Sequence, residues 1–288
     1  MSDLSSRFTI RAAAPGDAEG ILAVGIARDI ADVGYPDYDL GDVEEELAEA
    51  REACVVTDGE AIVAYAFIEG DDARVAVHPD VCGNGIGGAL LEWTEARGKG
   101  VIRQEAAGSN DAARRLLERA GYTATQHFWR MVRDLSEPSV AVPWPEGVSA
   151  RSYEPGADDA PAHALVRDAF TDIPGNVAHP LDEWRARSVG RPHFAPELST
   201  VAGEFAGIAL CERWDDGQGY LAYLATARDW RGRGLGRALL AASLEKMRAA
   251  GIERAALSVN ARNESATRLY ESVGMREASR ADRYEKRL

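Results

Sequence analysis

Apolar and polar residues alternate along this chain at two spacings, which together predict a mixed α/β fold. Short apolar runs with β-branched or aromatic members have the length and composition of strands, as in residues 61–69 and 254–260. Elsewhere apolar residues recur every three or four positions, as at Leu240, Leu244 and Met247, which predicts helices with one buried face.

The first half of the chain is expected to form one sheet flanked by helices. Expected strands are 8–12, 53–57, 61–69, 74–77 and 101–105. Expected helices are 15–32, 42–51, one that follows the glycines after Cys82 and ends near Gly98, and 111–120. Pro15 suits a first helical turn, and Gly121 suits a helix C-cap.

The second half is expected to repeat this order. Expected strands are 148–153, 198–202, 205–213, 220–226 and 254–260, with two closing strands at the end. Expected helices are 157–171, one around Trp184, one that follows the glycines after Arg231, and 264–273.

Two sequence matches support an internal duplication. The segment CGNGIGGALL from Cys82 aligns with RGRGLGRALL from Arg231, a shift of 149 residues (231 − 82). The segment NDAARRLLERAGY from Asn110 aligns with NESATRLYESVGM from Asn263. Prolines between the halves favour an extended linker. We therefore predict two tandem domains, 1–135 and 147–288, joined by a linker at 136–146.

The stretch from residue 220 to residue 240 carries the strongest chemical signal. An apolar strand ends in a loop of arginines and glycines, and this loop opens into a helix. A helix N-terminus offers free N–H groups and the positive end of the helix dipole, so it attracts anions. Glycines let the backbone approach a ligand closely, and arginines add charge. The pattern predicts an anion site, for which a pyrophosphate is the best candidate.

The spacing Arg231-x-x-Gly234-x-Gly236 resembles the R/Q-x-x-G-x-G/A signature of the GNAT acetyltransferases. The helix that begins at Asn263 and carries Tyr270 resembles theirs as well. The likeness covers nearly the whole chain as a fold, and its specific motifs lie within 224–240 and 260–274. It implies an α/β (α+β) fold class with two tandem GNAT folds, each a mixed, mostly antiparallel sheet flanked by helices, as in two-domain acetyltransferases of the mycothiol synthase type.

The resemblance implies acetyl-CoA as the acyl donor and Tyr270 as the general acid beside the thioester sulfur. Backbone N–H groups at the splayed end of the strand can stabilise negative charge on the acyl oxygen, and a phenol can protonate the leaving sulfur. The residues expected to contact coenzyme A are Leu224, Ala225, Thr226, Arg231, Gly232, Arg233, Gly234, Leu235, Gly236, Arg237, Asn263 and Ala266.

The first copy keeps the glycines but loses the charges. Cys82, Asn84 and Gly88 stand where the second copy has three arginines, and Leu117 stands where it has Tyr270. We expect the N-terminal domain to be non-catalytic and to support the other; coenzyme A binding by it stays open.

The sequence leaves the general base open. Many GNAT enzymes have a glutamate eleven residues before the R/Q, where this chain has Tyr220. Tyr220 and Glu212 are our catalytic candidates beside Tyr270; Asp215, Asp216, Tyr223 or a chain of water molecules are alternatives. His179 and His193 flank the helix around Trp184, where substrate contacts gather in this family, although a surface or capping role fits them equally well.

Composition and charge exclude some classes of binding partner. The chain has 33 Lys+Arg and 47 Asp+Glu, a formal net charge of −14, which argues against a general nucleic-acid binder and suits a cationic amine. Three scattered cysteines show neither metal-ligand nor disulfide spacing, so we expect no metal and a reducing cytoplasm. No apolar run reaches 18 residues and the first residues lack a signal-peptide core, so no membrane association is expected. A monomer or homodimer is expected.

These features predict an acetyl-CoA-dependent N-acetyltransferase that acts on a primary amine of a small molecule by direct attack in a ternary complex. The alternatives are acetylation of a cysteinyl amine as in mycothiol synthases, acetylation of a protein amine, and a non-catalytic acyl-CoA sensor. A dinucleotide fold is disfavoured. The literal Gly83-x-Gly85-x-x-Gly88 does not follow its strand directly, and Arg237 replaces the third glycine in the repeat.

Overall fold

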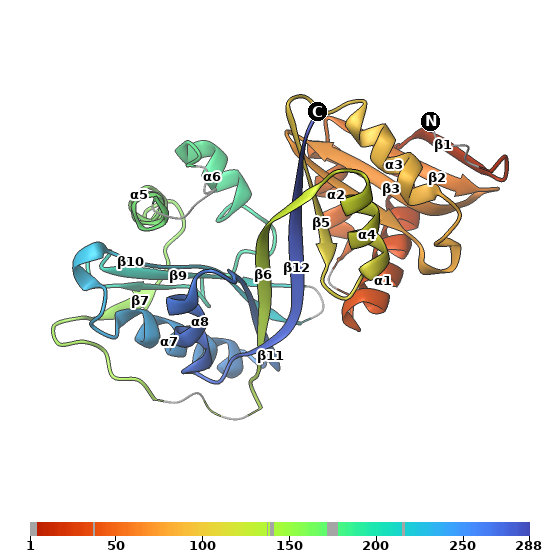
Figure 1. The fold of residues 1–288 in the computed structure, drawn as a ribbon. Coiled ribbons are helices and arrows are strands. Elements are labelled where there is room, and N and C mark those ends of the chain that lie inside the picture. Colours follow the sequence, from red (N-terminus) through yellow and green to blue (C-terminus); the bar gives the residue numbers. More distant parts are fainter. Residues whose placement is uncertain (1–4, 37, 137, 139–140, 172–177, 215–216) are drawn as a thin grey trace. The chain divides into compact units, whose positions relative to one another are not determined.

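The computed structural model of the 288-residue chain describes residues 5–36, 38–136, 138, 141–171, 178–214 and 217–288 (Figure 1). These residues form two compact units. Unit 1 consists of Met1–Phe128 and Ser279–Leu288, and unit 2 consists of Trp129–Ala278.

Unit 1 contains a mixed sheet with helices on both faces. Its strands lie in the order β1 (Phe8–Ala12), β2 (Glu52–Asp58), β3 (Ala61–Glu69), β4 (Asp72–Val77), β5 (Val101–Ala107) and β12 (Arg276–Arg287). Helices α1 (Ala18–Val33) and α2 (Leu40–Glu49) bury Ile21, Val24 and Val43 against one face, together with Tyr65 and Phe67 of β3. Helix α3 (Ile86–Glu95) packs Ile86 and Leu90 on strand residues of the other face, and α4 (Asp111–Arg119) adds Leu117 to a further apolar cluster.

Unit 2 repeats the arrangement. Its strands run in the order β6 (Thr123–Asp134), β11 (Arg254–Asn260), β10 (Gly219–Thr226), β9 (Gly207–Arg213), β8 (Thr200–Ala202) and β7 (Ala150–Ser152). Helices α5 (Asp159–Phe170) and α6 (Leu181–Arg187) cover one face, and α7 (Leu235–Ala249) and α8 (Glu264–Glu271) cover the other. The predicted fold class is confirmed: each unit is a mixed, mostly antiparallel sheet between helices.

One local device recurs in both units. After the first strand of unit 1, the Arg11 guanidinium donates to both Asp17 carboxylate oxygens at 2.7 Å. In unit 2, Arg151 contacts Asp158 in the same way at 2.6 and 2.7 Å. Each carboxylate also accepts a backbone N–H of the turn, from Ala14 and Glu154 respectively. This shared clamp agrees with the predicted duplication.

Two strands carry residues of both units. Residues 281–287 of β12 pair with 101–107 of β5, so the end of the chain completes the sheet of unit 1. Residues 129–134 of β6 belong to unit 2. The compact units therefore assign these strand ends differently from the predicted domains 1–135 and 147–288, which follow the sequence repeat.

The predicted elements mostly match, with two corrections. We expected two closing strands, but the structure forms one long strand, β12. No element was predicted for the residues after α4, where β6 runs from Thr123 to Asp134. β12 is rich in charged residues, and neither strand has the regular apolar alternation on which strand prediction depends.

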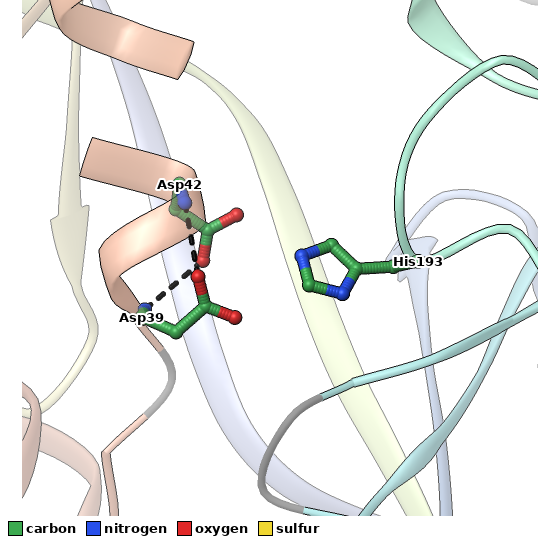
Figure 2. Close-up of side chains that lie close together, drawn as sticks. All are labelled: Asp39, Asp42 and His193. Atoms are coloured by element: carbon green, nitrogen blue, oxygen red, sulfur yellow. Dashed lines mark hydrogen bonds between the residues drawn. The ribbon is translucent and has the colours of Figure 1, made fainter. Parts of the chain in front are cut away.

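The predicted helix 42–51 begins and ends two residues earlier, at Leu40 and Glu49. A capping box explains its start: the Asp39 side chain accepts from the Asp42 N–H at 2.9 Å, and the Asp42 side chain accepts from the Asp39 N–H at 3.1 Å (Figure 2). Within the described residues no helix is long and apolar enough to cross a membrane.

Candidate active site

The strands β10 and β11 of unit 2 separate after a short contact. They pair in parallel only through Gly219 with Ala255 and Tyr220 with Ala256. From residue 221 onward β10 is paired on its other side alone, with β9. The N–H and C=O groups at the end of β10 that point away from β9 therefore have no neighbouring strand, as the prediction of a splayed strand end requires.

A β-bulge in β10 arranges its side chains. Tyr220 pairs with Glu212 and Tyr223 pairs with Leu210, so one extra residue lies between Leu221 and Tyr223. Glu212 and Leu210 are two positions apart on β9 and face the same side. Tyr220 and Tyr223 therefore also face that side, the side covered by α5 and α6, although they are three positions apart.

The loop after β10 has the backbone of an anion site. Gly232 and Gly234 adopt the left-handed conformation, with φ of 72° and 83°. Gly234 is the N-cap of α7 and offers no capping side chain, so the first turn of this 15-residue helix keeps its N–H groups for another acceptor. A Cβ atom built at either glycine would meet nothing within 4 Å, which shows open space above the loop.

The arginines of the loop are exposed, and each contacts a neighbouring carbonyl oxygen or ring. Arg231 donates to the Ala169 carbonyl oxygen at the end of α5 (3.1 Å), and Arg237 donates to the Ser272 carbonyl oxygen after α8 (3.2 Å). The Arg233 guanidinium lies over the Trp230 ring, 5.3 Å from its centroid. Each guanidinium has five N–H donors, so these contacts leave most of them available to a phosphate. The residues present therefore fit a diphosphate group.

A pocket of about 480 Å³ opens beside the same loop. It lies between the end of α5 and the end of β10, next to the carbonyl group that holds Arg231. Its volume is in the range of small-ligand sites. Its lining residues are Leu165, Asp168, Ala169, Thr171, Thr226, Ala227, Arg228 and Asp229.

Helix α8 places the predicted acid. The Asn263 side chain caps the helix by accepting from the Ala266 N–H at 3.2 Å, which agrees with the predicted start of the helix at this residue. Ala266, Leu269 and Tyr270 pack against the apolar cluster between α7 and the sheet. Burial, and after it the nearby Tyr220, raise the pKa of Tyr270 to about 12. Its phenol therefore holds its proton at neutral pH and can donate it.

Glu212 is the carboxylate closest in register to the strand position where a base is expected. Glu212 is buried, and its carboxylate accepts a hydrogen bond from the Trp214 indole N–H at 2.9 Å. Trp214 in turn stacks on Tyr220, with ring centroids 4.7 Å apart. Burial, and then the charge of Glu212, raise the pKa of Tyr223. Of the other predicted candidates, Asp215 and Asp216 lie outside the described residues.

Helices α5 and α6 place aromatic side chains over this group. The Phe170 and Trp184 rings lie 6.1 and 6.4 Å from the Tyr223 ring. His179 and His193 flank α6 as expected, and His179 contacts Glu183 through Nδ1 at 2.7 Å.

Family comparisons agree with this geometry. A model described as the acetyltransferase (GNAT) family matches residues 131–275, and a second GNAT domain model matches residues 49–124. A protein from Thermobispora bispora named mycothiol acetyltransferase is 34% identical over 275 residues, which cover 90% of this chain and 92% of that protein. The chain is a GNAT acyltransferase.

Further relatives show how widely the likeness extends. A Kineococcus radiotolerans protein, also named mycothiol acetyltransferase, is 36% identical over 73% of this chain and 71% of its own length. A crystal structure of a GCN5-related N-acetyltransferase from Sphaerobacter thermophilus aligns with a TM-score of 0.83 at 28% identity, over 99% of this chain and 96% of that chain. A tandem GNAT protein of the clavulanic acid pathway shares the fold, with a TM-score of 0.77 at 17% identity over 97% and 98% of the two chains.

The GNAT loop of unit 1 keeps its turn without its charges. Gly83 and Gly85 have φ of 87° and 79°, and α3 begins directly after Gly85. The Cys82 thiol lies 3.7 Å from an Arg28 nitrogen, and Leu117 is buried in an apolar cluster where unit 2 has Tyr270. Asn110 caps α4 as Asn263 caps α8, but its amide also donates to Asp32 of α1 at 3.1 Å.

Sequence reasoning missed two residues of this site. Trp214 was not singled out, although it binds the Glu212 carboxylate. Arg130 of β6 lies in unit 2, where its guanidinium sits over the Trp214 and Tyr220 rings at 5.1 and 5.9 Å. No local pattern could have found Arg130, because it precedes these rings by more than 80 positions.

Proposed function

We propose that unit 2 transfers the acetyl group of acetyl-CoA to a primary amine of a small molecule, by direct attack in a ternary complex. The observation that carries this proposal is the arrangement around β10. An uncapped, arginine-flanked helix N-terminus lies at one end of the strand, and Tyr220, opposite the buried Glu212 and close to Tyr270, lies at the other.

The loop and the splayed strand would bind the acyl donor, acetyl-CoA. The first-turn N–H groups of α7 and the guanidinium groups of Arg231, Arg233 and Arg237 would bind the diphosphate. The unpaired edge of β10 at Leu224, Ala225 and Thr226 would take up the arm that carries the thioester, with Asn263 and Ala266 on the α8 side. Bound acetyl-CoA supplies an acyl carbon activated by a thiol leaving group.

Proton transfer falls to two side chains. Glu212 would take a proton from the ammonium form of the acceptor, directly or through a water molecule, so that the neutral amine forms the new C–N bond. Backbone N–H groups of β10 would stabilise the negative charge on the acyl oxygen. Tyr270 would give its proton to the sulfur as the C–S bond breaks, and the proton that the nitrogen then loses would restore the phenol, which leaves free coenzyme A and the amide.

The relatives named mycothiol acetyltransferase favour one acceptor in particular, the cysteinyl amine of a mycothiol precursor. The sequence departs from the family pattern at Tyr220, where a glutamate is expected. Glu212 lies directly across the ladder from Tyr220, so a carboxylate is still present on this side of the sheet. A cysteinyl amine therefore remains the second candidate within the same reaction class.

Release of free thiol from acetyl-CoA tests the proposal. The full chain should release thiol only when an amine is present, and mass spectrometry should show an acceptor 42 Da heavier, the mass of an added acetyl group. Binding of acetyl-CoA without thiol release across polyamines, amino sugars, amino-acid amides, cysteinyl amines and lysine peptides would instead favour a sensor.

A further inference from the structure

Trp184 of α6 has a buried hydrogen-bond donor that finds no partner in the part of the chain that the structure describes. The residue is 5% exposed, and its indole nitrogen makes no hydrogen bond within the described residues. Trp214 provides the contrast, because its indole N–H donates to Glu212 at 2.9 Å. A buried N–H that finds no acceptor destabilises the folded protein, so such groups are uncommon and often have a function.

The donor lies in the layer that covers the proposed acceptor site. The Trp184 ring is 6.4 Å from the Tyr223 ring and 5.5 Å from the His163 ring. Tyr223 shares its side of the sheet with Tyr220 and Glu212, because of the bulge in β10. The Glu212 charge also acts on the Tyr223 phenol, so these groups are electrostatically close.

Packing of this helix does not in itself require a donor. Val43 occupies the fourth position of α2 in unit 1, as Trp184 does in α6, and is fully buried. The non-catalytic copy therefore fills the corresponding place with an aliphatic side chain. The catalytic copy places there an aromatic ring with one N–H.

We propose that the Trp184 N–H donates a hydrogen bond to an oxygen atom of the acceptor, so that the enzyme selects amines that carry a hydroxyl, ether or carbonyl oxygen. This inference rests on the acetyltransferase function proposed above. An alkyl amine of the same shape leaves the buried N–H unsatisfied in the complex. A site built to bond such a group discriminates against the analogue that lacks it.

Two pairs of nearly isosteric amines test the selection. Ethanolamine is compared with propylamine, and 2-methoxyethylamine with butylamine, by thiol release from acetyl-CoA. The oxygen lowers the basicity of the amine, so kcat/KM is calculated for the neutral amine in every case. The methoxy oxygen can only accept a hydrogen bond, so a preference that remains after this correction identifies a donor on the protein. The wild-type chain should favour the oxygen-bearing member of each pair by about 10-fold in kcat/KM.

The matched variant replaces Trp184 with β-(3-benzothienyl)alanine, which keeps the ring and replaces the N–H with sulfur. We expect the preference to fall to near unity, chiefly because the oxygen-bearing amines react more slowly. Trp184→Phe should act in the same direction. Trp93→Phe in unit 1 should leave the preference at the wild-type value, and thermal denaturation checks that each variant is folded.

Three results would overturn the inference. The wild-type chain could show no preference, or the benzothienylalanine variant could keep it, as expected if a buried water molecule satisfies the indole. If the chain binds acetyl-CoA but releases no thiol with any amine, the proposed acetyltransferase function is itself wrong. This result can be told apart from the other two because no amine of either pair then reacts.

Discussion

Glu212 of β9 and Tyr220 of β10 lie directly opposite each other in an antiparallel ladder. Opposed residues project to the same side of a sheet, so the carboxylate and the phenol share one surface. Tyr270 of α8 is close enough to Tyr220 for the Tyr220 phenol to contribute to the raised pKa of Tyr270. The three side chains predicted from sequence as catalytic are therefore linked through Tyr220.

The first prediction concerns Glu212. The Glu212→Gln variant keeps an oxygen that can accept from the Trp214 N–H but cannot take a proton from the acceptor. We expect kcat/KM at pH 7.5 to fall by roughly 10²–10⁴-fold, with a smaller loss at higher pH, where more of the amine is already neutral. Glu204→Gln, on an exposed turn, is the control. A Glu212 variant with wild-type turnover would exclude Glu212 as the base.

Tyr220→Phe separates the two candidate bases. If Glu212 takes the proton, removal of the Tyr220 hydroxyl should change turnover by less than about 10-fold, because the ring still stacks on Trp214. A loss as large as that of the Glu212 variant would transfer the role to the Tyr220 hydroxyl.

The third prediction concerns Tyr270. Tyr270→Phe should slow turnover by roughly 10²–10⁴-fold and leave the dissociation constant of acetyl-CoA unchanged in calorimetry. Thioesters of more acidic thiols should restore part of the rate, because their leaving groups need less protonation. Full activity in the variant would reduce Tyr270 to a packing residue.

The pH profile provides a fourth prediction. The pKa of Tyr270 is raised to about 12, so its phenol remains protonated below that value and is lost as an acid only above it. With both substrates saturating, kcat should therefore show no descending limb between pH 7 and pH 10. A descending limb in this range that disappears in Tyr270→Phe would contradict the raised pKa.

The fifth prediction concerns the loop arginines. Arg231→Ala and Arg233→Ala should each weaken acetyl-CoA binding by roughly 10-fold, because charge-assisted hydrogen bonds to phosphate are lost. The remaining affinity should depend less on salt than that of the wild-type chain. Cys82→Ala, at the equivalent position of the first copy, should leave binding unchanged at one acetyl-CoA per chain. Two equivalents per chain in the wild type would show a second site in unit 1.

The sequence was sufficient for the local elements because their signals are local. Strands β1, β3 and β11 begin and end where the apolar runs predict, and Asn263 caps α8 as its position suggested. Gly232 and Gly234 likewise take the left-handed conformation that their residue type allows.

Long-range pairing could not be inferred in this way. The contact between Arg103 and Glu285 spans 182 positions, and nothing near either residue indicates its partner. The alignment of Tyr223 with Leu210, which puts Tyr223 on the same side of the sheet as Tyr220, depends on the bulge beside Leu221, and a pattern with a strict period of two does not reveal it. The group of side chains that shares one side of the sheet with Tyr220 could therefore not be read from the sequence.

The clamp of Arg11 with Asp17, repeated by Arg151 with Asp158, has a consequence for the history of the chain. Both halves hold this scaffold bond, whereas a tyrosine at the acid position and arginines around the glycines occur in one half alone. The two halves therefore share an architectural contact and differ in the residues of the proposed site. Each substitution at the proposed site therefore has an internal reference, since the corresponding position of the other half can be changed in the same molecule.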